Sequence, residues 1–318
     1  IGNGVNSLSP VNIKNNIVGS ITASSTTGGV SVFGINQNCA SCASNVSNNT
    51  IGSTTTVNSI TVSSTSTLYG NDLVAINSGA SSSGNNTISS NTIANLSNNI
   101  AVNLGFVLNG IQVSAGTTSV TANTVRDLTT ISINASTTNT AALTGINIVG
   151  SNLVNVNNNT IYNLSNTSSA FAGIVNGILM YSNTSFAHQF KNNFIYGLST
   201  NPSASNAKIY GINSSFGSNT FSNNVISVVS NIPASVFGIY DQSTLTSSYY
   251  FNTVYLAGQA GSGTNNSAAY FGNTGTYVRN IYNNIFYNGR INSGSATGKH
   301  YAAFLNYASS TTVSLGYN

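Results

Sequence analysis

An asparagine followed by a short run of aliphatic and β-branched residues recurs along the whole chain. It appears in SNTIANLSNN from Ser90, in NNNTIYNLSN from Asn157 and in KNNFIYGLST from Lys191. We call this asparagine the anchor, and consecutive anchors lie 28 to 42 residues apart, most of them 31 to 36. A unit of that length with a strand in every copy predicts a solenoid. The anchors are Asn16, Asn49, Asn91, Asn123, Asn159, Asn193, Asn224, Asn252 and Asn284.

A second motif has the form hydrophobic-x-Gly-Ile. Its glycine lies 13 to 15 residues before the next anchor, at Gly34, Gly145, Gly211 and Gly238. One full unit divides into strands at 209–214, 218–224 and 225–229. Helical repeats are excluded because the units lack 3.6-residue periodicity, and four-stranded propeller blades need longer units. We therefore predict an all-β parallel β-helix of about nine coils, with three short strands per coil, as a single domain over 1–318.

Asparagine-rich turns fit this architecture. The second strand must turn sharply into the third, and Asn adopts the left-handed backbone conformation more readily than any residue except Gly. Stacked coils would place the anchor side chains above one another, so that their amides form a hydrogen-bonded ladder. We predict such a ladder at the nine anchors. Glycosylation is the competing interpretation, because Asn45, Asn95, Asn158, Asn163 and several other asparagines stand in N-x-[ST] sequences.

The strand after the anchor predicts which side chains face the core. Two positions after the anchor nearly every coil has Ile, Val or Phe, and we expect these to point inward. Three positions after it the residues are mixed and should point outward, among them Arg126, which is hard to bury without a partner. Four outward tyrosines could form an aromatic strip that contacts sugar rings or another protein, unless Tyr is there only because it suits exposed strands. They are Tyr162, Tyr196, Tyr255 and Tyr287.

The NNTI-type turns and their spacing resemble the right-handed parallel β-helix proteins of the pectate-lyase-like superfamily. More narrowly, the chain is similar to the Asn-, Ser- and Thr-rich repeat regions of large secreted bacterial surface proteins. The resemblance covers essentially the whole chain and implies a right-handed helix. It also implies that a polysaccharide lyase or hydrolase activity must be considered.

The residues argue against such an activity. Glycoside hydrolysis normally needs two neighbouring carboxylates, and calcium needs several oxygen ligands. The three acidic residues, Asp72, Asp127 and Asp241, fall at different places in different coils, and His188 and His300 have no nearby triad partners. We predict no enzyme, no catalytic residue, no cofactor and no metal. Charged residues make up 3% of the chain, so the net charge of +4 provides no phosphate-binding patch, and we expect no nucleic-acid partner.

Two cysteines, Cys39 and Cys42, form the sequence CASC in a loop between a first strand and an anchor turn. No helix follows, which argues against a redox motif, and no further ligands are near enough for zinc. A local disulfide or a free pair of thiols remains.

The function expected from these features is structural. No stretch of about 20 apolar residues exists, so we expect no membrane insertion. A chain with so little charge suits an extracellular or cell-surface location, solubilised by hydroxyls, amides and glycans. Both ends read as coil sequence without a cap, which predicts head-to-tail contacts between copies and a surface filament, fibre or sheath. The alternative is an adhesin or glycan-binding stalk module of a larger cell-surface protein.

Overall fold

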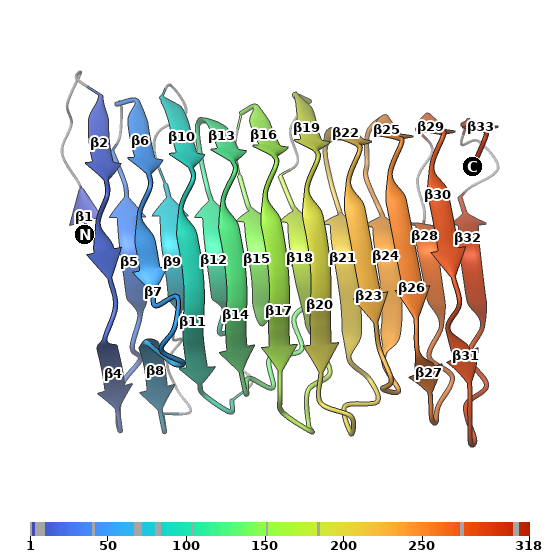
Figure 1. Ribbon diagram of the computed structural model, residues 1–318, viewed down its shortest axis with the longest axis horizontal. Helices are drawn as coiled ribbons and strands as arrows, with labels where there is room; N and C mark the ends of the chain where they lie inside the picture. The colour runs from blue at the N-terminus through green and yellow to red at the C-terminus, as the bar shows by residue number, and fades with distance from the viewer. Residues whose placement is uncertain are drawn as a thin grey trace.

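The computed structural model describes residues 2–3, 10–39, 42–66, 72–79, 84–102, 105–150, 152–182, 185–273, 277–307 and 312–318. The described residues form a parallel β-solenoid of about nine coils and contain no helix, which confirms the predicted fold class. In Figure 1 the front strands run downward and the rear strands upward while the chain advances from left to right, which is the right-handed sense. Three long sheets, named A, B and C below in the order in which the second coil enters them, run the length of the molecule.

Sheet A contains the hydrophobic-x-Gly-Ile motif. Its strands pair in parallel with the equivalent strand of each neighbouring coil. They are β1 (Gly2–Asn3), β5 (Val32–Gln37), β9 (Leu73–Ser78), β12 (Leu108–Val113), β15 (Leu143–Ile148), β18 (Ile174–Met180), β21 (Lys208–Ser214), β24 (Ser235–Asp241), β28 (Ser267–Asn273) and β32 (His300–Asn306).

Each strand of sheet B leads into an anchor turn. Its strands are β2 (Val11–Lys14), β6 (Ser44–Ser47), β10 (Asn85–Ser89), β13 (Thr117–Thr121), β16 (Val154–Asn157), β19 (Ala187–Lys191), β22 (Ser218–Ser222), β25 (Ser247–Tyr250), β29 (Arg279–Tyr282) and β33 (Val313–Gly316).

Sheet C follows the anchor. Its strands are β3 (Ile17–Val18), β4 (Ile21–Ser25), β7 (Thr50–Gly52), β8 (Ile60–Ser64), β11 (Thr92–Asn99), β14 (Thr124–Thr130), β17 (Thr160–Asn166), β20 (Phe194–Thr200), β23 (Val225–Val229), β26 (Thr253–Ala257) and β30 (Ile285–Asn288). A small separate pair, β27 (Gln259–Ala260) and β31 (Ile291–Asn292), lies beyond it in the last coils.

The core is a continuous stack of aliphatic and aromatic side chains between the three sheets. The position two residues after the anchor is buried from Ile51 to Val254, as the sequence predicts. The motif glycines of sheet A lie opposite this column. A Cβ at Gly145 would lie 2.6 Å from Cγ2 of Ile161 and 2.6 Å from the Gly177 carbonyl oxygen, so the two sheets can approach only where the side chain is absent or small.

The left-handed residue of the turn is not the anchor, as we had expected, but the residue before it. Asn158 has φ 58°, and its counterparts in the other coils include Ser90, Ala122 and Phe251. The anchor is the next residue, and its N–H points along the stack and donates to the anchor of the following coil. The turn and the ladder are therefore built by two adjacent residues, and only the second must be Asn.

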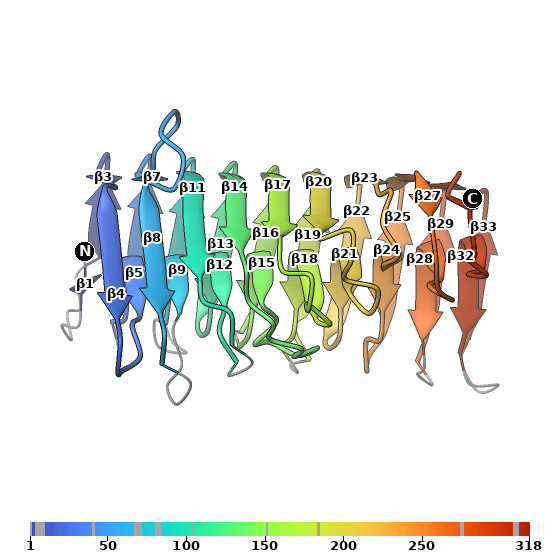
Figure 2. The same ribbon diagram turned by 90° about the horizontal axis from the view of Figure 1, so that it is seen from below.

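A second left-handed residue lies four positions after the anchor in most of the first six coils, at Ser20, Asn95, Asp127, Asn163 and Gly197. It is an extra residue in the strand, so the next inward side chain is the fifth after the anchor, as with Leu164 in β17. In the second coil the extra length within the strand is the loop 53–59 between β7 and β8, which provides most of the additional residues in the 42-residue gap. This loop interrupts the strand and projects outward (Figure 2).

Candidate functional site

The anchors form a hydrogen-bonded ladder with one direction. Nδ2 of Asn159 donates to Oδ1 of Asn193 at 3.0 Å, and the Asn159 N–H donates to the same oxygen at 3.1 Å. Nδ2 of Asn159 also donates to the Val120 carbonyl oxygen at 2.9 Å. The same amide-to-Oδ1 contact recurs from Asn16 to Asn318, always donated toward the C-terminal coil. The sequence analysis found the first nine asparagines of this ladder and missed the last, Asn318.

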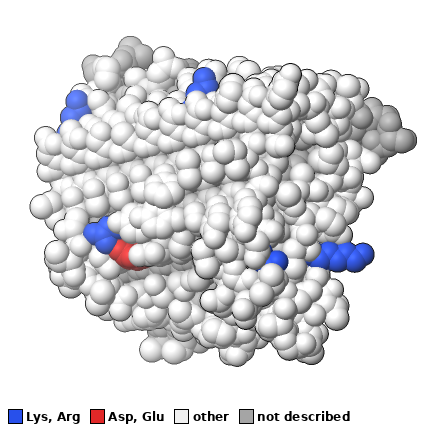
Figure 3. All heavy atoms as spheres, turned by 45° about the vertical axis from the view of Figure 1, so that its right-hand side comes forward, with Lys and Arg blue, Asp and Glu red and all other residues white. Residues whose placement is uncertain are grey.

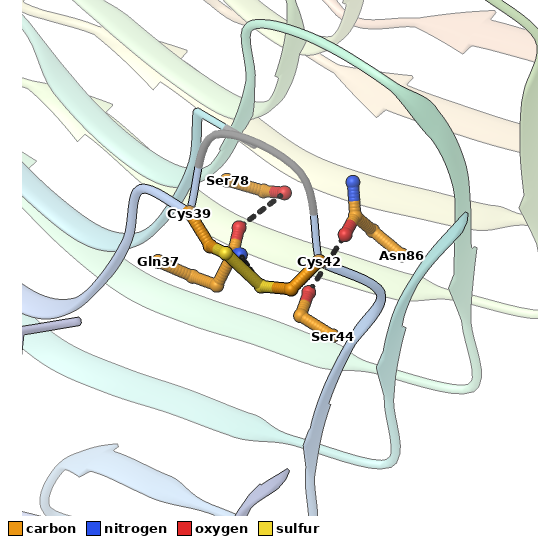
Figure 4. The surroundings of a disulfide bond; sticks show 6 residues. All are labelled: Gln37, Cys39, Cys42, Ser44, Ser78 and Asn86. Carbon is orange, nitrogen blue, oxygen red and sulfur yellow. Dashed lines mark hydrogen bonds between the residues drawn. A yellow bond between two sulfur atoms is a disulfide. The ribbon is translucent and has the colours of Figure 1, made fainter. Parts of the chain in front are cut away.

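The cysteines Cys39 and Cys42 are joined by a disulfide and are buried, with 5.7 Å between their Cα atoms. Gln37 lies against them, and its amide nitrogen Nε2 is 3.9 Å from Sγ of Cys42 (Figure 4). The carbonyl oxygen of this buried amide accepts a hydrogen bond of 3.4 Å from Ser78 in the next coil. The pair therefore pins the loop between β5 and β6 against the core.

The four tyrosines lie in one outward column of sheet C, and Ser227 interrupts that column. Tyr162 stacks on Tyr196 with 4.8 Å between ring centroids, and Tyr255 stacks on Tyr287 at 5.2 Å. Each pair has nearly parallel rings. The faces that a sugar ring would contact are thus used between the tyrosines themselves, and the column is two stacked pairs instead of one flat strip.

A polar groove runs beside the first tyrosine pair, and the sequence analysis missed it. Its volume is about 380 Å³, and it follows the left-handed column of sheet C across several coils. We call it the sheet C groove, and it is lined by Val57, Asn58, Asn95, Asp127, Thr129, Asn163, Ser165, Gly197 and Ser199. The signal in the sequence is an Asn, Asp or Gly at the fourth position after the anchor, followed by Leu.

Among the described residues that line or flank this groove, only Arg126 and Asp127 have charged side chains. They form a partly exposed ion pair. Arg126 also donates to the Thr54 carbonyl oxygen at 2.8 Å, and Asp127 accepts from Nδ2 of Asn163 at 3.0 Å. The pair therefore braces the base of the loop 53–59 against the groove floor. The face shown in Figure 3 has few other charges.

A second ion pair is fully buried in the last coils, where the sequence analysis treated Asp241 only as an isolated acid. Nε of Arg279 donates to Oδ2 of Asp241 at 2.6 Å, and both residues have no exposed surface. The same oxygen accepts from the hydroxyls of Tyr270 at 3.0 Å and Tyr307 at 2.8 Å. Burial is the largest effect on the Arg279 guanidinium and lowers its pKa, but the Asp241 carboxylate, Tyr249, Tyr307 and Tyr270 together outweigh burial and raise that pKa. Burial, and next the same carboxylate, raises the pKa of Tyr270.

The remaining candidate residues stay apart. His188 is fully buried in β19, and its Nδ1 accepts a 3.1 Å hydrogen bond from the Val154 N–H. Burial lowers its pKa to about 4. His300 forms hydrogen bonds with Ser267 and Asn292. Asp72 lies apart from both histidines in the sequence, and burial raises the pKa of its carboxyl group. Within the described ranges, no three His, Cys, Asp or Glu side chains come together.

The last described coil contains an apolar pocket. Its volume is about 370 Å³, and Tyr270, Phe286 and Ala303 are among its lining residues. Leu305 is 39% exposed and Leu315 is 56% exposed at its rim. The edge strands β30, β32 and β33 border this end of the three sheets.

The comparisons with known proteins identify no relative. No family model matches the chain, no curated protein matches it, and no solved structure matches it. In the described part of the chain, no helix has the length and apolar character needed to cross a membrane.

Proposed function

We propose that the protein is an extracellular structural solenoid whose copies stack head to tail into a surface filament, without catalysis. We also propose that the chain is related to the right-handed β-helix proteins of the pectate-lyase-like superfamily, and more narrowly to the repeat regions of secreted bacterial surface proteins. The scarcity of charge and the disulfide between Cys39 and Cys42 support an extracellular location.

The observation that carries the proposal is the direction of the asparagine ladder. Every anchor donates its N–H and one Nδ2–H toward the next coil. Asn318 accepts from Asn284, and its Nδ2 donates to the Ile281 carbonyl oxygen at 2.8 Å, so the ladder continues with its backbone N–H and its second amide hydrogen. At the other end Asn16 donates to Asn49, and none of the described residues donates to its Oδ1. One end therefore offers donors and the other an acceptor, and a second copy placed in the same orientation joins them.

The sheet edges and the apolar end agree with this contact. Each sheet has one edge strand at each end, such as β2 and β33 in sheet B, and all strands are parallel. Stacking in the same orientation would continue the parallel pairing and cover Leu305 and Leu315. Unpaired strand edges next to exposed apolar side chains are the usual template for recruiting another chain. Such a head-to-tail contact does not close into a ring, so it propagates.

Electron microscopy and light scattering of the purified 1–318 chain test the proposal. We expect filaments with an axial repeat of roughly 40–50 Å, since about nine coils rise by about 4.8 Å each. The filaments should persist in 1 M NaCl, because the contact contains no ion pair.

Variants locate the contact. Leu305→Asp with Leu315→Asp should leave single rods, because two charges would be buried at the end face. Phe194→Asp with Val225→Asp is the matched control, since both side chains are 42% exposed on β20 and β23, two strands that are paired on both sides. Monodisperse rods from the wild-type chain, or filaments that survive the end variant, would refute stacking.

A further inference from the structure

The sheet C groove has the composition of a binding site that the stacking of copies does not use. In the bulged coils the left-handed residue separates two outward columns, the tyrosines on one side and a row of hydroxyls on the other. The hydroxyls belong to Thr129, Ser165 and Ser199, which are in register on adjacent strands. Within the described structure these three hydroxyls have no hydrogen-bond partner in the protein and face the groove.

The backbone and the charges exclude two classes of partner. The strands β11, β14, β17 and β20 that form the groove are each paired on both sides, so no edge is available for an added peptide strand. The charges at the groove are one Arg and one Asp that neutralise each other, so a phosphate backbone finds no net attraction. Recognition here must come from uncharged side-chain hydroxyls and amides.

We propose that the sheet C groove binds a linear, uncharged polysaccharide along the axis of the solenoid. Each coil repeats one hydroxyl at about 4.8 Å spacing, which suits a polymer that repeats its own hydroxyls along a line more than a compact ligand. This proposal does not depend on the stacking of copies.

One end of the groove has a wall. The loop 53–59 contributes Val57 and Asn58 to the lining. Its base is held by Nδ2 of Asn95, which donates to the Ser53 carbonyl oxygen at 2.7 Å, and by Arg126. The groove continues past Asn163 and Gly197 and loses its bulge at β23. The bound chain should therefore enter from the C-terminal side and end at the loop.

The test is an array of immobilised polysaccharides probed with the whole chain. The neutral members are cellulose, β-1,3-glucan, chitin, mannan and xylan, and the acidic members are alginate and polygalacturonate. We expect binding to at least one neutral polymer, unchanged in 1 M NaCl. Oligosaccharides of the bound polymer then give affinities by calorimetry.

The groove variant is Asn163→Gly with Ser165→Ala. It removes an amide and a hydroxyl, and it keeps the backbone, because Gly197 holds the same left-handed conformation in the next coil. We expect a loss of affinity of tenfold or more, as for two lost hydrogen bonds. The control is Ser227→Ala with Thr253→Ala, which removes two hydroxyls from the flat part of the same sheet face.

Three outcomes would overturn the proposal. The first is binding to no neutral polymer, whether or not an acidic polymer is bound. The second is an equal loss of affinity in the control, and the third is equal affinity of the groove variant and the wild type. Filament formation by a chain that binds no polysaccharide would leave the stacking proposal intact, so the two ideas fail separately.

Discussion

The first six coils and the last three share one asparagine ladder but differ on both sides of sheet C. In the first six, the strand after the anchor contains a left-handed extra residue or a loop, and its outer face is a polar groove. In the last three, β23, β26 and β30 are regular, and their outer face exposes Val229, Tyr255 and Ile285. The core of the last coils also differs, because Phe221, Tyr249 and Tyr270 pack there beside a buried ion pair.

The comparison shows that one residue per coil determines the surface without altering the fold. With the extra residue, the inward side chains are the second and fifth after the anchor, as in Ile161 and Leu164. Without it, they are the second and fourth, as in Ile226 and Val228. Both patterns place two apolar side chains in the core, so the coils stack equally well. The outer face is then free to be a groove or a flat apolar sheet.

The ladder is the element that should not distinguish the two regions. Asn159→Ala in the first region and Asn252→Ala in the second each leave several buried donors and acceptors without partners. We expect each to lower the free energy of unfolding by about 4 kcal/mol or more, by chemical denaturation. Asn158→Ala is the control and should cost about 1 kcal/mol or less, since Ala122 already fills that turn position. A large difference between the two anchor variants would show that the ladder itself differs.

The two ion pairs should separate the regions. Asp241→Ala leaves the Arg279 guanidinium buried without its carboxylate and should cost about 3–5 kcal/mol. Asp127→Ala breaks a pair that is partly exposed and should cost about 1 kcal/mol or less. The double variant Asp241→Leu with Arg279→Met should regain part of the loss, because it removes the uncompensated charge but leaves the Ser243 N–H without its acceptor. Equal losses for the two single variants would contradict the assigned difference in burial.

Much of the fold could be predicted because each coil repeats the same local requirements. The Asn anchor recurs in every coil, and the matching position of sheet A is Gly in most coils and Ala in β9 and β28, so both stand out as periodic signals. Other features depend on contacts between coils. Asp241 and Arg279 are 38 residues apart and meet only through stacking. Ala94 is outward in register yet fully buried, and it lies beside the inserted loop, whose Ser53 N–H donates to its carbonyl oxygen.

The candidate site was predictable only in part. The tyrosine column follows from the strand register, but the stacking of its rings in pairs depends on which residue separates them, here Ser227. The groove has a sequence signal in Asn95, Asp127, Asn163 and Gly197, all at the fourth position after an anchor. That signal is difficult to use from sequence alone, because Asn and Gly are abundant throughout the chain.

His188 makes the stability of the sixth coil depend on pH. Burial lowers its pKa to about 4 in the folded chain, against about 6.5 when unfolded, so the unfolded chain binds the extra proton. Its contribution to stability is complete above about pH 6.5 and is lost as the pH falls toward 4, by up to about 3 kcal/mol. His188→Asn copies Asn219, its partner in the next strand, and should remove this part of the dependence. Parallel curves for the two proteins between pH 7 and 4 would contradict the prediction.

The smallest effect tests the bulge itself. Asn163 has φ 54°, a conformation that Gly adopts freely and a β-branched residue does not. Asn163→Gly should change the free energy of unfolding by less than about 1 kcal/mol, whereas Asn163→Val should cost about 1–3 kcal/mol. The matched change in the flat region is Ser227→Val, on an outward position of a regular strand, where Val should be neutral or slightly stabilising. If Val were tolerated equally at both positions, β17 would be regular like β23, and the groove would lose its structural cause.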